Sequence, residues 1–298
     1  ARNRESVRLA RDWVLLSGDA AFRCFILYKT LPVRHAGVGL ARKIGMDEAC
    51  RRLETVSNPR GVIACFDADS RCDPNYLRAL ESHFAIHPDC PACSIYFEHP
   101  LAGSEFDEPV YRAIAEYELH LRYYVQAQRW AGFPHAFHTV GSSMAVRCAD
   151  YQRQGGMNRR KAGEDFYFIH KFTPLPGFAA LNDTRVIPSP RPSHRVPFGT
   201  GRAIGEMLAA ERGYESYHPS TFEELRRFLQ GLPAFYKKDR RPDLAEYPEM
   251  LRDFLQQQSF GEKLEELRAH SAAYDTFRDR FFRWFNAFLV MKYAHFAR

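Results

Sequence analysis

The sequence lacks an apolar run as long as a membrane-spanning helix, and its first residues do not form a signal peptide. It also lacks a dense block of basic residues, although the formal net charge is +6 and the sequence pI is 8.9. The mild positive charge suits an anionic ligand or a membrane surface, and the missing basic block argues against a nucleic-acid partner. We therefore expect a cytoplasmic protein, with peripheral contact to a membrane left open.

Cysteine offers no sign of a disulfide framework or a zinc site. The seven cysteines are odd in number, and several fall in expected strands or helices. Cys90 and Cys93 form a C-x-x-C pattern. A zinc site needs a second such pair, which the chain lacks. A redox pair lies at the start of a helix, whereas this pair precedes a predicted strand. We expect reduced cysteines in the core of a cytosolic protein.

The length and the apolar patterning predict an α/β fold. The chain has 298 residues, 45% of them hydrophobic and 26% charged, which is ordinary for a globular protein. Apolar runs bounded by turn signals predict strands, and apolar residues at helical spacing predict helices. The expected strands are 22–28, 61–66, 92–97, 138–147 and 184–188, and the expected helices between them are 2–13, 37–53, 74–86, 107–130 and 162–171.

The alternation of strands and helices continues to about residue 190. It predicts a mostly parallel mixed sheet flanked by helices. We place an α/β domain at 1–202 and a C-terminal helical extension at 203–298.

Two acids follow the predicted buried strand in the segment GVIACFDADSRCDP, residues 61–74. In open parallel sheets, ligands bind beyond the carboxyl ends of the strands, where Asp67 and Asp69 are expected. Two carboxylates one residue apart can both reach a hard cation, and such a cation can hold a diphosphate. A turn capped by Asp69 and Ser70 is an equally good interpretation of the pattern alone.

Other motifs accompany this pair in a definite order: a Gly-Ser strand ending in Arg147, then Gly155-Gly156, then Glu164-Asp165 at the start of a predicted helix. The joint order resembles the family-2 type of A-fold glycosyltransferases over about residues 20 to 200. The segment 36–45 is similar to the stretch that leads into the second helix of that family. The resemblance implies an A-type nucleotide-diphospho-sugar transferase fold (GT-A-like), with residues 1–202 as the nucleotide-sugar-binding catalytic domain.

The resemblance also implies roles for single residues. Asp69 matches the acid that binds a divalent metal, manganese or magnesium, and Asp67 matches the acid that contacts the nucleotide ribose or the metal. Asp165 matches the catalytic base, and Glu164 matches a supporting contact to the acceptor. Arg42 lies where a basic residue contacts the nucleotide or its diphosphate. An acidic first helical turn, favoured by the helix dipole, is the alternative for Glu164-Asp165.

Two features depart from that family. Its apolar first strand, which binds the nucleotide base, is missing ahead of the first predicted helix, so we expect a fragment or residues preceding Ala1. The segment QAQRW, residues 126–130, matches the Q-x-x-R-W string of processive polysaccharide synthases. In those enzymes the string follows the catalytic acid, whereas here it precedes Asp165, and we therefore expect a non-processive enzyme.

A loop rich in proline and arginine, residues 191–202, follows the last predicted strand. In A-fold enzymes a late histidine often completes the metal shell, and a late loop closes over the donor. By this resemblance His194 is a candidate metal ligand, and Arg191 and Arg195 are candidates to contact the diphosphate. A solvated basic loop is the alternative for each of the three.

The last stretch of the chain, residues 277–296, is rich in aromatic residues separated by Arg and Lys. Helical spacing gathers the aromatics on one broad face, which predicts a helix docked on the catalytic domain. The alternative is an interfacial helix that brings the protein to a lipid-linked acceptor at a membrane. The face consists of Phe277, Phe281, Trp284, Phe285, Phe288 and Tyr293.

Taken together, the motifs predict a metal-dependent, inverting, non-processive glycosyltransferase of the hexosyltransferase type. It would move a sugar from a nucleotide-diphosphate donor to a hydroxyl of a glycan or lipid-linked acceptor, and inversion rests on the resemblance alone. A nucleotidyltransferase of related fold is one alternative. A catalytically silent sugar- or partner-binding module is another, against which the intact Asp67, Asp69 and Asp165 argue.

Overall fold

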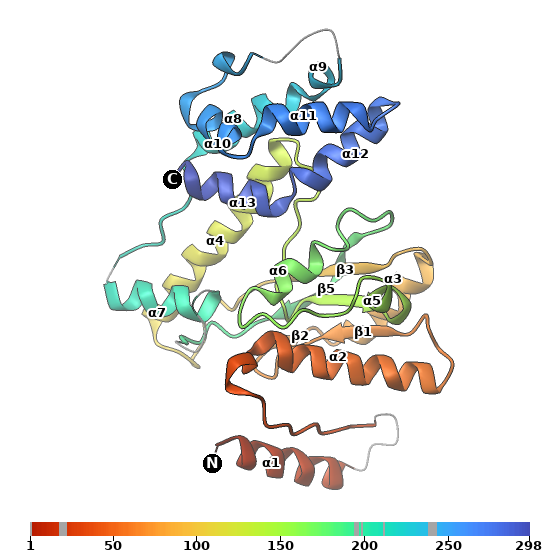
Figure 1. The fold of residues 1–298 in the computed structure, drawn as a ribbon. Helices are drawn as coiled ribbons and strands as arrows, with labels where there is room; N and C mark the ends of the chain where they lie inside the picture. Colours follow the sequence, from red (N-terminus) through yellow and green to blue (C-terminus); the bar gives the residue numbers. More distant parts are fainter. Residues whose placement is uncertain (1, 18–22, 194–196, 198, 211, 238–242) are drawn as a thin grey trace.

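A five-stranded sheet lies at the centre of the computed structural model, which describes residues 2–17, 23–193, 197, 199–210, 212–237 and 243–298 (Figure 1). The strand order is β1-β4-β3-β5-β2. Apolar side chains on both faces of β3 and β4 make them the buried middle of the sheet. The strands are β1 (Val62–Cys65), β2 (Arg71–Cys72), β3 (Ala92–Phe97), β4 (Met144–Arg147) and β5 (Ala179–Ile187).

The expected α/β class and the mixed sheet flanked by helices are confirmed, but the expectation of mostly parallel pairing is wrong. Three of the four strand pairs are antiparallel, and only β3 and β5 pair in parallel. Two of the antiparallel pairs arise because β4 inserts between β1 and β3 in the opposite direction, and the third is the pair of β2 with β5. Because β1, β3 and β5 still point the same way, their carboxyl ends share one edge of the sheet.

Helices cover the sheet and connect its strands. The predicted helices at 37–53, 107–130 and 162–171 are all present, with slightly different ends. A short helix at 148–153 was not expected. The helices of this part are α1 (Arg2–Ser17), α2 (Val38–Thr55), α3 (Tyr76–Ile86), α4 (Glu108–Trp130), α5 (Cys148–Arg153) and α6 (Glu164–Ile169).

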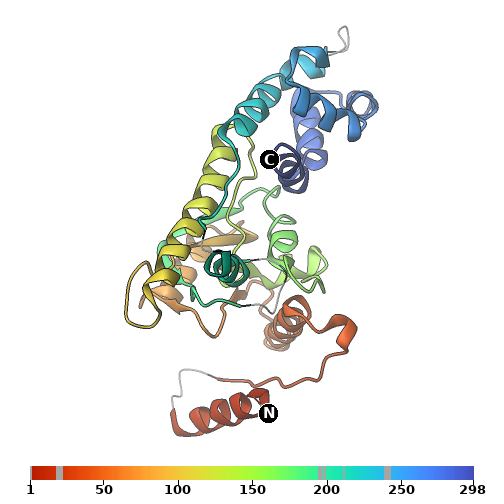
Figure 2. The same cartoon turned by 90° about the vertical axis from the view of Figure 1, so that its left-hand side faces the viewer.

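The strand predicted at 22–28 is not formed in the described residues, because residues 23–32 contain no regular element. The segment instead runs extended between α1 and α2, at the outer side of α2 (Figure 2). Its aromatic side chain Phe25 stacks under the guanidinium of Arg52, 3.3 Å from the ring centroid. The residues of this segment favour the β-conformation, but no strand lies beside them to pair with. The segment is therefore extended without forming the hydrogen bonds of a sheet.

Every regular element described after β5 is helical, as the sequence predicts. The first of these helices, α7, spans the expected boundary at residue 202 and packs along α4. No helix within the described ranges has the length and apolarity needed to cross a bilayer. The helices are α7 (Thr200–Ala210), α8 (Pro219–Gln230), α9 (Leu232–Tyr236), α10 (Glu249–Gln257), α11 (Phe260–Ala269), α12 (Tyr274–Trp284) and α13 (Ala287–Phe296), with single 3-10 turns at Val33–His35 and Leu244–Glu246.

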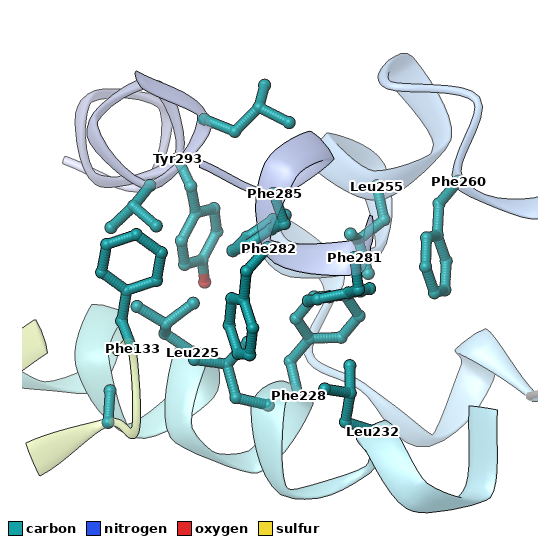
Figure 3. Close-up of a cluster of buried hydrophobic side chains, with 14 of the residues drawn as sticks. Phe133, Leu225, Phe228, Leu232, Leu255, Phe260, Phe281, Phe282, Phe285 and Tyr293 are labelled. Carbon is teal, nitrogen blue, oxygen red and sulfur yellow. The ribbon is translucent and has the colours of Figure 1, made fainter. Parts of the chain in front are cut away.

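Aromatic rings fill the core of the helical extension (Figure 3). The rings of Phe281 and Phe285 contact Phe228 of α8, with centroids 5.9 and 5.3 Å apart. The expected burial is confirmed for Phe277, Phe281, Phe285 and Tyr293, whereas Trp284 is partly buried and Phe288 is exposed. The expected partner was the catalytic domain, but the rings pack mainly against α8 to α11 and the end of α4. Phe277 and Tyr293 are also fully buried, so these rings are not available to a bilayer.

Candidate active site

The two acids of the D-x-D pattern lie in a turn directly beyond β1. The Ser70 N–H donates to the Asp67 carbonyl over 2.9 Å, which closes the turn, and β2 begins at Arg71. The side chains of Asp67 and Asp69 are 49% and 46% exposed. Both carboxylates therefore lie at the edge shared by the carboxyl ends of β1, β3 and β5, accessible to a ligand.

Arg42 joins three separate parts of the chain at this edge. Its Nη2 lies 3.1 Å from Asp67 Oδ1, its Nε lies 3.3 Å from Glu164 Oε1, and its Nη1 donates to the Gly141 carbonyl over 2.6 Å. The side chain is only 9% exposed. Burial alone would lower the pKa of Arg42, but the nearby acids, Asp67 first among them, raise it above its ordinary value. The guanidinium is therefore a fixed cation.

The Glu164-Asp165 pair begins α6 directly after Gly163, whose φ of 67° suits glycine. Glu164 is buried against Arg42, with 4% of its side chain exposed. Asp165 Oδ1 accepts from the Phe166 N–H over 2.8 Å. Burial, together with the neighbouring Glu164 carboxylate, raises the pKa of Asp165 to about 7. A carboxyl with that pKa can exchange a proton near neutral pH.

Gly141 is a member of the site that the sequence motifs did not reveal. A β-carbon at this position would lie 2.7 Å from Arg42 Nη2 and 3.2 Å from Asp165 Oδ2. The absent side chain thus lets the cation and the acid approach the same stretch of backbone. In the sequence, Gly141 lies inside the expected strand 138–147, and nothing in that pattern indicates this contact.

Arg191 closes the other side of the acidic turn. It follows β5 and lies 2.5 Å from Asp69 Oδ2, with both side chains about half exposed. Each acid of the D-x-D pattern therefore has its own arginine, one buried and one exposed. The other two candidates of that loop, His194 and Arg195, lie outside the described residues.

Arg147, by contrast, belongs to the framework. It is buried at the far end of β4, where its guanidinium donates to the carbonyls of Arg60, Phe84, His87 and Cys90. These bonds tie the end of α3 and two loops to the sheet. Arg147 therefore stabilises the fold and is not part of the candidate site.

The described side chains supply only some of the ligands that a divalent cation needs. No group of three or more His, Cys, Asp or Glu side chains within the described ranges is arranged to hold a metal. Asp67 and Asp69 supply two oxygen ligands. Magnesium keeps several waters and is commonly held by one or two carboxylates together with substrate phosphates, so two carboxylates at an open edge suit that mode of binding.

Comparison with known proteins gives no relative: no protein-family model, no curated protein and no solved structure matches the chain.

Proposed function

We propose that the chain is a metal-dependent, inverting, non-processive glycosyltransferase that uses a nucleotide-diphosphate sugar. The observation that supports this best is the meeting of Arg42, Asp67, Glu164 and Asp165 at one edge of the sheet. It joins a strand-end acid, a fixed cation and a carboxyl with a pKa of about 7, although these residues lie far apart in the sequence.

The donor side consists of the acidic turn and its two arginines. Guanidinium groups bind phosphate oxygens with paired N–H groups, so Arg42 and Arg191 are suited to the diphosphate. Asp69 and Asp67 would hold the metal, which when bound neutralises the negative charge that develops on the departing diphosphate. In the structure the arginines pair with these acids, and a diphosphate would compete for the same guanidinium groups.

The acceptor side consists of Asp165. An acceptor hydroxyl is a poor nucleophile near neutral pH, and a positioned carboxylate makes it a better one by taking its proton. The acceptor oxygen forms a bond to the anomeric carbon while the bond from that carbon to the diphosphate oxygen breaks. The electron pair of the broken bond leaves with the nucleoside diphosphate, and the proton goes to Asp165. Attack opposite the leaving group inverts the anomeric centre.

Release of nucleoside diphosphate from a panel of nucleotide sugars, with manganese and a panel of glycans and lipid-linked sugars, tests the proposal. We expect one donor to be consumed only when an acceptor is present. Asp165→Asn should lower the transfer rate by about 10²–10⁴-fold, the usual contribution of a general base, while donor binding persists. Asp275→Asn, at an exposed acid of α12, is the matched control. A near-normal transfer rate in Asp165→Asn would assign the base to another residue.

A further inference from the structure

Two cysteine side chains meet in the core between α2 and the sheet. Cys50 lies on the second half of α2, and Cys148 begins α5 directly after β4, 98 positions further along the chain. Their Sγ atoms are 2.9 Å apart, which is closer than non-bonded atoms of this size usually approach, and both residues are free thiols in the structure. Among the described residues, no other two cysteine sulfurs lie in hydrogen-bond contact.

The surrounding structure keeps the two sulfurs adjacent. Cys50 is 4% exposed and Cys148 is fully buried. The Cys148 N–H donates to the Gly61 carbonyl over 2.8 Å, which fixes the start of α5 to the segment that leads into β1. Cys148 Sγ also lies 3.7 Å from the Cys50 carbonyl oxygen, so it contacts both the side chain and the backbone of its neighbour. The two thiols therefore face each other in a closed part of the core.

We propose that Cys50 and Cys148 are an oxidation site, which hydrogen peroxide converts to a disulfide that joins α2 to the start of α5. A disulfide holds its sulfurs about 2.05 Å apart. The two Sγ atoms therefore need to approach each other by only about 0.9 Å from their present 2.9 Å. Peroxide is the oxidant that suits this place, because it is small enough to enter a packed core. The proposal is independent of the proposed glycosyl transfer.

The oxidation takes place in two steps. The sulfur of one cysteine attacks an oxygen of the peroxide, the O–O bond breaks, and the thiol becomes a sulfenic acid with release of one water. The sulfur of the second cysteine then attacks the sulfenic sulfur, the S–O bond breaks, and a second water leaves with the proton of the second thiol. The two thiols lose two electrons and two protons in total, and one peroxide is reduced to two waters.

Burial should make this reaction slow. Burial, together with the hydrogen bond to Cys148, raises the pKa of Cys50 to about 12. The thiolate is the reactive form of cysteine, so little of Cys50 is reactive near neutral pH. Cys24 and Cys72 are exposed and should react first. The cross-link should therefore form only under sustained contact with peroxide.

The cross-link should stabilise the fold without displacing the candidate site. It closes a loop of about 98 residues in the unfolded chain, and disulfides that close long loops restrict the unfolded state most. Arg42 lies on the same helix as Cys50, about two turns earlier. Because the sulfurs move so little, α2 should keep its position, and Arg42 should keep its contacts to Asp67 and Glu164.

Peptide mapping by mass spectrometry tests the proposal on the full chain. The folded protein is incubated with hydrogen peroxide until Cys24 and Cys72 are fully oxidised, and the remaining thiols are then alkylated and the chain is digested. We expect a peptide pair linked through Cys50 and Cys148, which dithiothreitol separates. The oxidised chain should melt about 5 °C or more above the reduced chain, the size expected for a disulfide that closes a long loop.

Two variants serve as controls. Cys148→Ala should lose both the linked peptides and the gain in Tm, whereas Cys90→Ala, at a buried cysteine outside the pair, should keep both. Absence of the linked peptides once the exposed cysteines are oxidised overturns the proposal, and so does a linkage of Cys50 or Cys148 to another cysteine. A cross-link that leaves the Tm unchanged also overturns it, because a bond formed in the native geometry must restrict the unfolded chain. The mapping needs only the wild-type protein, so it holds even if a variant fails to fold.

Discussion

The sheet edge and the helical extension are stabilised by opposite means. At the edge, charged side chains meet in pairs around an exposed turn, and one of their acids has its pKa raised to about 7. In the extension, fully buried rings from five helices fill one core. Burial of rings stabilises a fold with little dependence on pH. Clustered charged groups lower the stability of the folded state, and they can bind ligands or transfer protons. The difference supports assigning the proposed reaction to the sheet edge and a structural role to the extension.

The two regions nevertheless meet at α6. Phe166 packs against the core of the extension, while its neighbour Asp165 faces Arg42 and Gly141. The extension therefore contributes to the position of the candidate base. A change in either region should therefore affect the other through α6.

Removal of the C-terminal aromatics should have the largest effect. A chain ending at Asp275 lacks Phe277, Phe281, Phe285 and Tyr293, and each buried aromatic contributes roughly 1.5–3 kcal/mol. The combined loss is comparable to the whole stability of a typical domain, about 5–15 kcal/mol. We expect no cooperative thermal transition for the extension in circular dichroism. Phe288→Ala, at an exposed ring, should melt nearly as the wild type, and an unchanged Tm in the shortened chain would contradict the burial seen here.

Gly141→Ala should damage the sheet edge and spare the extension. The new methyl would lie 2.7 Å from Arg42 Nη2, so the guanidinium must move away from Asp67 or Glu164. We expect transfer to fall by about 10²-fold, the loss typical of a misplaced catalytic group, with the Tm of the helical core retained. Gly45→Ala is the control, because a β-carbon there meets nothing within 4 Å. Full transfer activity in Gly141→Ala would show that the reaction does not require the close approach of Arg42 and Asp165 to the backbone at this position.

Much of this comparison follows from the sequence, and its gaps have physical causes. Local patterns located β3, α4 and the acids beyond β1, because periodicity and turn residues act within a few positions. Strand direction is set by distant partners, and the antiparallel insertion of β4 was therefore missed. Through the resemblance, Arg42 was expected to contact the nucleotide or its diphosphate, and its pairing with Asp67 and Glu164 was not predicted. Gly141 gave no local signal, since its importance comes from atoms of α2 and α6.

The pH dependence of Asp165 should separate its catalytic role from its effect on stability. Its pKa of about 7 in the folded chain exceeds the ordinary value of 3.8, so the folded state binds the proton more tightly than the unfolded state. Stability should therefore fall as the pH rises from about 4 to about 7, and should then level off. Transfer should rise over the upper part of that range, because only the carboxylate accepts a proton. Denaturant unfolding and initial rates measured from pH 5 to 8 report the two trends.

Asp165→Asn provides the control for the pH experiment. Asparagine does not titrate, so the unfolding free energy of this variant should change less between pH 5 and 7 than that of the wild type. Equal slopes in the two proteins would mean that another group causes the trend.

Asp69→Asn should have the smallest effect on stability and a clear effect on binding. Asp69 and Arg191 form an ion pair at 2.5 Å, but both side chains are about half exposed, and pairs of this kind contribute about 0–1 kcal/mol. We expect a change in unfolding free energy within that range.

If Asp69 holds the metal, the same variant should bind manganese together with nucleoside diphosphate about tenfold or more weakly by calorimetry, since a carboxylate ligand is replaced by a neutral amide. Asp275→Asn, which breaks a similar exposed pair with Arg278, should leave that binding unchanged. Unchanged calorimetric binding in Asp69→Asn would remove Asp69 from the donor site and leave Asp67 as the strand-end acid there.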